Sequence, residues 1–221
     1  MVDRQRTDPS SALLERLAHD LRGPLSPMQT ATWLLRKGGL SPDRHGELLD
    51  ILDRQSDRLS GMVQEISDWV RARDGRLLTR RETVPVPLFL DLVTATTDGA
   101  PDWEQGPGLQ DATLCGDVQR LVQMLSTLAG FLDARGGLVR WSAKAGGEAL
   151  ALDLEAGGPW EQGERELVFS GPHPSPHDGG LGMGLLISRE IARAHGGSVD
   201  TGKPGSGNAG FAVVLPLGRA D

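Results

Sequence analysis

His19-Asp20-Leu21-Arg22-Gly23-Pro24-Leu25 places an imidazole beside a carboxylate, within a run of residues whose apolar members recur at helical spacing. The apolar side chains around it alternate at intervals of three and four residues, as in a helix that buries one face: Leu14, Leu17, Leu21, Pro24, Met28, Ala31 and Leu35. His19 lies off this seam, so we expect its ring to face solvent. An exposed histidine with a base next to it predicts a reactive residue.

Two helices are predicted around this motif, joined as an antiparallel hairpin. The first begins at the helix-start signal Asp8-Pro9 and ends at Gly38-Gly39. A second start signal, Ser41-Pro42-Asp43, opens a helix with its own apolar seam, and Trp33 and Trp69 are predicted to lie in the core of the bundle.

The second helix carries more apolar surface than one partner helix can cover. Further apolar side chains flank its seam at Ile51, Val63 and Val70. Two hairpins that pair into a four-helix bundle would bury this surface, so we expect a homodimer. The alternative is a monomeric hairpin packed against a second domain of the same chain.

The composition is acidic and contains few special residues. The 23 Lys and Arg against 30 Asp and Glu give a formal net charge of -7, which argues against nonspecific affinity for nucleic acid or anionic membranes. The single cysteine, Cys115, excludes a disulfide framework and favours a reducing, cytoplasmic setting. No apolar run reaches the length of a membrane span, and the first ten residues do not resemble a signal peptide. The expected partner is a protein or a small molecule.

A polar stretch over residues 74–81 separates the hairpin from a segment of mixed strands and helices. We therefore predict two domains, over residues 8–73 and 82–218. In the second domain, short apolar runs occur at 139–141, 149–154 and 211–217, the last two with strand-like composition, and helices are predicted at 118–134 and 185–195. This pattern predicts an α/β sandwich of sheet and helices. The span 103–114 is too rich in Gly, Pro and Asp to predict an element.

Glycines cluster immediately before the last predicted helix, in Gly179-Gly180-Leu181-Gly182-Met183-Gly184. Glycines allow the backbone to bend close to a ligand, and the helix that follows directs unpaired N–H groups and the positive end of its dipole at the loop. The sequence therefore predicts a phosphate cradle. The alternative is a flexible loop that caps a helix.

Taken together, these motifs resemble those of two-component sensor histidine kinases. Residues 19–25 resemble the phosphoacceptor box, and Gly180, Gly182 and Gly184, followed by Ala194-His195-Gly196-Gly197, resemble the second glycine box of the ATP-binding domain. The motifs occur in the family's order, and the resemblance covers roughly residues 10–218. It implies a dimeric hairpin domain that carries the phosphorylated histidine, followed by a Bergerat-type α/β sandwich for ATP.

The chain departs from the family at the magnesium site. Residues 117–125 resemble the start of the asparagine box, but the two expected asparagines are Thr127 and Phe131. A phenyl ring cannot coordinate a hard cation that prefers oxygen ligands, so no magnesium ligand is expected at Phe131. Ala134 stands where a lysine is usual in the family, with Arg135 beside it.

The first glycine box departs as well. The match is Glu155-Ala156-Gly157-Gly158-Pro159, in which the resemblance implies that Glu155 reads the adenine amino group and Gly157 belongs to the nucleotide site. Pro159 replaces a glycine, and residues 170–178 form a short, stiff substitute for a mobile lid. Bound ATP would be poorly enclosed, so we expect autophosphorylation from ATP to be impaired. His173 and His177 have metal-like spacing, but the prolines between them prevent a shared helical face, and no metal site is expected.

The remaining chemistry suits phosphoryl exchange at His19. In the expected reaction, Asp20 orients the ring and acts as a base, and Arg22 offsets phosphate charge. The alternatives are a solvated helix charge for Asp20 and an ordinary ion-pair partner for Arg22. The magnesium ion would come from a receiver domain. Relatives that dephosphorylate their partner carry Thr or Asn where this chain has Gly23, so that reaction is not expected here.

Two functions follow as hypotheses. The first is a phosphorelay protein in which His19 exchanges phosphoryl groups with the aspartate of a response-regulator receiver domain, loaded either by an atypical autokinase or by another phosphoprotein, such as an upstream histidine kinase. The alternative is a non-enzymatic pseudokinase scaffold that docks a kinase or response regulator. Its α/β domain would either bind nucleotide as a regulatory signal or bind no ligand. From the residues before the hairpin and from Met1, we expect a stand-alone relay component rather than part of a longer protein.

Overall fold

The computed structural model describes residues 9–173, 180–202 and 207–218. Two long helices, α1 (Pro9–Lys37) and α2 (Pro42–Arg73), form an antiparallel hairpin. Gly38 and Gly39 both take positive φ values, 71° and 74°, which glycine adopts without strain and which let the chain reverse between the helices. The Ser41 hydroxyl then accepts the backbone N–H of Arg44 at 3.3 Å and caps α2.

The hairpin buries one stripe of each helix and leaves apolar side chains on the outside. Pro24 and Ala31 of α1 and Leu48 and Met62 of α2 are buried. Several large apolar side chains of the hairpin are exposed: Leu25, Trp33, Leu49, Val63 and Val70. Trp33 is 59% exposed in the single chain, so its place in the core of a dimeric bundle stays a prediction. It follows Ala31 by two positions, which places it roughly 200° around the helix from the buried stripe.

The second part of the chain combines two sheets with a layer of helices. Its helices are α3 (Val86–Thr96), α4 (Val118–Asp133), the short α5 (Glu164–Leu167) and α6 (Gly184–Ala194). Its strands are β1 (Glu82–Pro85), β2 (Trp103–Gln105), β3 (Thr113–Gly116), β4 (Leu138–Gly146), β5 (Ala149–Ala156), β6 (Ser198–Thr201) and β7 (Gly210–Pro216). A five-stranded sheet has the order β2-β4-β5-β7-β6, in which β2 and β4 are parallel and the other pairs antiparallel. β1 and β3 form a separate antiparallel pair.

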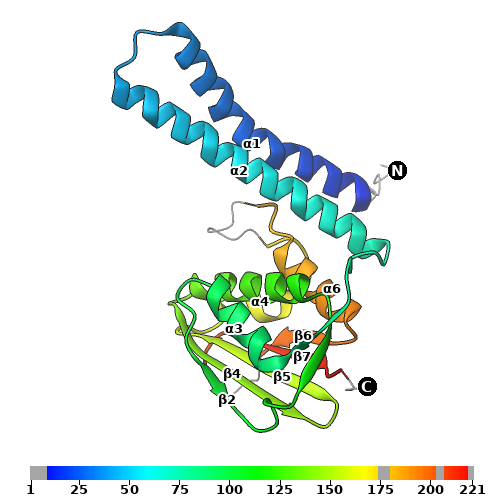
Figure 1. Ribbon diagram of the computed structural model, residues 1–221. Helices are drawn as coiled ribbons and strands as arrows, with labels where there is room; N and C mark the ends of the chain where they lie inside the picture. The colour runs from blue at the N-terminus through cyan, green and yellow to red at the C-terminus, as the bar shows by residue number, and fades with distance from the viewer. Residues whose placement is uncertain (1–8, 174–179, 203–206, 219–221) are drawn as a thin grey trace, which may run out of the picture.

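The helices α3, α4 and α6 lie on one face of the larger sheet, and the hairpin extends from the same side (Figure 1). Burial alternates strictly along β5, so Leu150, Leu152 and Leu154 point toward the helices and their neighbours do not. Trp141 and Phe211 complete this core from β4 and β7. The predicted architecture, a helical hairpin followed by an α/β domain, is confirmed. Among the helices of the described residues, none is both long and apolar enough to cross a membrane.

Candidate functional site

His19 projects from α1 into solvent beside an acidic neighbour. Its side chain is 84% exposed, and its Nδ1 atom lies 3.1 Å from Oδ1 of Asp20. Arg22 lies one turn further along α1 and is exposed; within the part of the chain that the structure describes it makes no ion pair. A Cβ atom added at Gly23 would meet nothing within 4 Å. The structure therefore brings His19 and Asp20 together and leaves the surface around them open.

Phe131 belongs to a cluster of aromatic rings drawn from four parts of the α/β domain. The aromatic cluster comprises Phe131, Trp160, Phe169 and Phe211. The Phe131 ring lies 5.8 Å from the Phe211 ring and 6.2 Å from the Trp160 ring, centroid to centroid. His173 packs edge-on against Phe131 at 5.3 Å. Phe131 is only 5% exposed, so rings fill the place where the family resemblance implies a magnesium ligand.

Arg135 closes over this aromatic cluster. Its guanidinium carbon lies 3.8 Å from the centroid of the Phe131 ring, and Nη1 donates to the Phe131 carbonyl at 2.7 Å. The guanidinium also forms an ion pair with Glu164, whose side chain is 8% exposed. The cation beside the asparagine-box position is thus held within the domain by contacts with its own chain.

Glu155 lies on the opposite face of the sheet from the aromatic cluster. Its Oε1 atom is 3.6 Å from Nη1 of Arg140, a residue of the open sheet face. Ala156, the next residue, is fully buried under the helices. The Glu155 side chain therefore points away from the aromatic cluster, because adjacent residues of a strand point to opposite faces.

Gly157 allows a close approach between two backbone segments. Its N–H donates to the Gly137 carbonyl at 3.0 Å, and a Cβ atom there would lie 2.6 Å from the Gly136 carbonyl oxygen. Only glycine permits these two backbone segments to approach so closely.

The glycine loop does lie at the N-terminal end of α6, as predicted. Gly182 takes a φ of 76°, and a Cβ atom at Gly184 would lie 2.9 Å from Cγ2 of Thr127 in α4. The N–H groups of Leu181 and Met183 donate to Oε2 of Glu65, at 3.0 and 3.2 Å. Glu65 comes from α2, so the loop holds a carboxylate of the hairpin.

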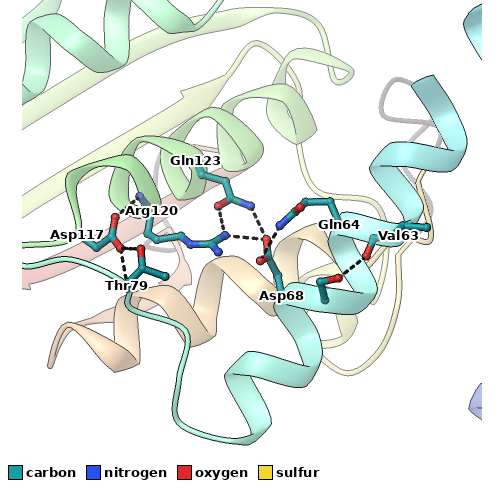
Figure 2. Close-up of polar contacts among 8 residues, drawn as sticks. Val63, Gln64, Asp68, Thr79, Asp117, Arg120 and Gln123 are labelled. Atoms are coloured by element: carbon teal, nitrogen blue, oxygen red, sulfur yellow. Dashed lines mark hydrogen bonds and ion pairs between the residues drawn. The ribbon is translucent and has the colours of Figure 1, made fainter. Parts of the chain in front are cut away.

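A second carboxylate of α2 is held by α4 (Figure 2). The Asp68 side chain is 1% exposed and pairs with Nη1 of Arg120 at 2.7 Å. Gln123 of α4 and Gln64 of α2 donate to the same carboxylate at 3.1 and 2.9 Å. A buried charge needs such partners, and this cluster provides a cation and two amides.

Asp117 ties the segment after the hairpin to the start of α4, as Figure 2 also shows. Its carboxylate accepts the Thr79 N–H and hydroxyl at 2.9 and 3.0 Å, the Arg80 N–H at 3.2 Å and the Arg120 N–H at 3.2 Å. Burial alone would raise the pKa of Asp117, but the hydrogen bonds from Thr79, Arg120 and Arg80 outweigh it and lower that pKa.

His195 supports Asp117 from α6. Its Nε2 atom accepts the Asp117 N–H at 2.9 Å, so Nδ1 carries the proton and donates to the Ile191 carbonyl at 2.8 Å. Burial lowers the pKa of His195; the bond to Ile191 and the charge of Asp117 oppose this shift, and the charge of Arg81 adds to it. The sequence indicated only a helix end at this histidine.

We expect acid to destabilise the fold through His195. Because the native pKa is lowered, the unfolded chain binds this proton first, and the free energy of unfolding falls as the pH drops below about 6.5 toward the native pKa. Urea unfolding of the wild-type chain and of His195→Gln across this range measures the effect. Glutamine keeps an acceptor for the Asp117 N–H but does not titrate, so the variant should lose this component of the pH dependence. An identical pH dependence in both proteins would contradict the assignment.

The comparisons with known proteins agree with this geometry. Residues 10–75 match the His Kinase A (phospho-acceptor) domain. Nitrogen regulation protein NtrY of Azorhizobium caulinodans is 27% identical over 90% of this chain, which covers 28% of that protein. Alginate biosynthesis sensor protein KinB of Pseudomonas aeruginosa is 26% identical over 94% of this chain, which covers 37% of its length. The chain thus spans only about a quarter to a little over a third of these relatives.

Solved structures share the whole arrangement of hairpin and α/β domain. The Acinetobacter baumannii histidine kinase AdeS matches with a TM-score of 0.67 and 19% identity, over 91% of this chain and 98% of that one. Histidine kinase ThkA, solved in complex with response regulator protein TrrA, matches with a TM-score of 0.68 and 19% identity, over 93% of this chain and 61% of that one. Residues 10–75 thus match the phospho-acceptor domain of histidine kinases, and the whole chain is similar in sequence to two-component sensor histidine kinases and similar in fold to solved ones.

Proposed function

We propose that His19 accepts a phosphoryl group and exchanges it with the aspartate of a response-regulator receiver domain. The observation that carries the proposal is the contact between an 84% exposed His19 and Asp20, at 3.1 Å. With the Nδ1 proton held by Asp20, the lone pair lies on Nε2, which faces an incoming phosphoryl group. Asp20 acts here as a positioning residue.

The exchange balances without a further reactant. The bond from Nε2 to phosphorus forms as the aspartyl oxygen–phosphorus bond breaks, and the electron pair of the broken bond returns to the aspartate carboxylate. The magnesium ion that offsets the phosphoryl charge is held by the receiver in this proposal, so this chain needs no metal ligand of its own. The exposed Arg22 adds positive charge one turn away from His19.

We infer further that His19 is not loaded from ATP bound to this chain. Three features of the structure argue against a magnesium-bound nucleotide: the Phe131 ring offers no oxygen ligand, Glu155 points away from the aromatic cluster, and Glu65 of the hairpin occupies the glycine loop. The phosphoryl group would then come from another phosphoprotein, such as a receiver domain or an upstream histidine kinase.

We propose that the protein acts as a homodimer. Leu25, Trp33, Val63 and Val70 leave apolar surface on the outside of the hairpin. Burial of this surface against a second hairpin would complete a four-helix bundle while His19 stays exposed. The related structure of ThkA is a complex with a response regulator, which supports a receiver domain as the partner here.

A second candidate function is a non-enzymatic scaffold that docks a kinase or response regulator. The observation that favours it is the packed aromatic cluster, in which Phe131 offers no oxygen ligand for magnesium. In this case His19 is dispensable, and its replacement by alanine leaves signalling in the cell intact.

Two labelling reactions test these proposals. The purified chain is incubated either with labelled ATP and magnesium, or with receiver domains from the same organism that carry labelled phosphoaspartate. We expect acid-labile label on the chain from a receiver and none from ATP. Strong labelling from ATP would overturn the inference about the nucleotide site, and no label from any receiver would favour the scaffold.

A further inference from the structure

The contact of Glu65 with the glycine loop joins segments that lie 116 and 118 residues apart in the sequence. One carboxylate oxygen receives both the Leu181 and the Met183 N–H groups, at 3.0 and 3.2 Å. A Cβ atom at Gly180 would collide with the other carboxylate oxygen, so a side chain at this position would displace Glu65. The loop is therefore shaped closely around a carboxylate.

The donors that hold Glu65 are those that an external anion would use. Leu181 and Met183 immediately precede α6, where the helix dipole adds positive potential and favours any negatively charged oxygen. A cavity of about 410 Å³ lies beside the loop, between α2, α4 and α6, and both Glu65 and Thr127 line it. There is space for a small anion once the carboxylate is removed.

The position of Glu65 is fixed by a second contact one turn further along α2. There, Asp68 is buried against Arg120 and Gln123 of α4, at 2.7 and 3.1 Å. Glu65 and Asp68 therefore hold α2 to two different elements of the α/β domain. As long as the Asp68 contact persists, the Glu65 carboxylate stays at the loop at high effective concentration.

We propose that Glu65 is an autoinhibitory ligand of the glycine loop. While α2 is docked on the α/β domain, its carboxylate occupies the donors of the loop and excludes phosphate-bearing ligands from them. Release of α2 or removal of the carboxylate opens the loop to an anion. The inference does not depend on phosphoryl exchange at His19, because it concerns only the contact between hairpin and loop.

Hydrogen exchange of the whole chain tests the contact directly. In Glu65→Ala the amides of Leu181 and Met183 should exchange at least about tenfold faster than in the wild type, since each loses a bond to a charged acceptor. Inorganic pyrophosphate, added without metal, should slow their exchange again in Glu65→Ala but not in the wild-type chain. Glu47→Ala is the matched control, because Glu47 is an exposed glutamate of the same helix that pairs with Arg44.

The amide of Ile191 inside α6 serves as the internal reference, since its unchanged exchange shows that the helix stays folded. Unchanged exchange of Leu181 and Met183 in Glu65→Ala would overturn the proposal. It would also be overturned if pyrophosphate protected the wild type as well as the variant, or protected neither. No phosphoryl donor enters this experiment, so failure of the labelling reactions leaves its outcome unaffected.

Discussion

The His19→Ala variant is expected to lose the acid-labile label that the wild-type chain accepts from a phosphorylated receiver domain. Removal of a nucleophile costs on the order of a thousandfold or more in rate, so the label should fall to background. The fold should be preserved, because the His19 side chain is 84% exposed and its contact in the structure is with the neighbouring Asp20. The measurement is label on the chain as a function of time at a fixed receiver concentration.

His45→Ala is the matched control for this variant. His45 is also an exposed histidine on the hairpin, but it lies in the first turn of α2, close to the reversal of the chain. Its replacement should leave the labelling unchanged. Label that persists in His19→Ala would show that another residue accepts the phosphoryl group, and it would refute the role proposed for His19.

The Phe131→Asn variant should lose about 3–5 kcal/mol of the free energy of unfolding. Asparagine is the residue that the family resemblance places at this position, so the substitution also asks whether a magnesium ligand can be restored. The variant removes ring contacts with Trp160, His173 and Phe211 and leaves the Arg135 guanidinium without the ring beneath it. It also buries an amide among aromatic rings. Urea unfolding measures the loss.

Phe131→Leu separates the effect of lost volume from that of a buried polar group. Leucine keeps an apolar side chain in the aromatic cluster, so the expected cost is only about 1–2 kcal/mol. ATP with magnesium should stabilise neither variant against unfolding. If Phe131→Asn were as stable as the wild type and gained stability from magnesium and ATP, then the cluster would not be the packed core described above.

Much of the fold follows from local sequence signals. The hairpin was predictable because its stop signal, Gly38-Gly39, and its start signal, Ser41-Pro42, perform these roles in the structure. β5, β7, α4 and α6 were predictable from their apolar pattern, whereas the short apolar run inside β4 did not by itself indicate a strand. β2 has only three residues and pairs with β4 across more than 30 residues of sequence, so no local pattern specifies it. The pairing of β1 with β3 depends in the same way on a distant partner.

In the candidate site, too, the features with local sequence signals were predictable and those that depend on distant partners were not. His19 and Asp20 are sequence neighbours on one helix, so their contact was predictable. The glycine loop was predictable from its composition. The face of the sheet on which Glu155 lies was not predictable from the motif, because a shift of one residue along a strand moves a side chain to the other face. Glu65 carries no local signal, since an acidic residue on an amphipathic helix is usually solvated and its partners lie 116 and 118 residues away.

Arg120 takes part in both contacts that join the hairpin and the connecting segment to the α/β domain. Its backbone N–H donates to Asp117, which holds Thr79 and Arg80, while its guanidinium pairs with Asp68 of the hairpin. The segment that leaves the hairpin and the hairpin itself are therefore fastened to the same first turn of α4. Because both contacts share Arg120, we expect them to be energetically coupled.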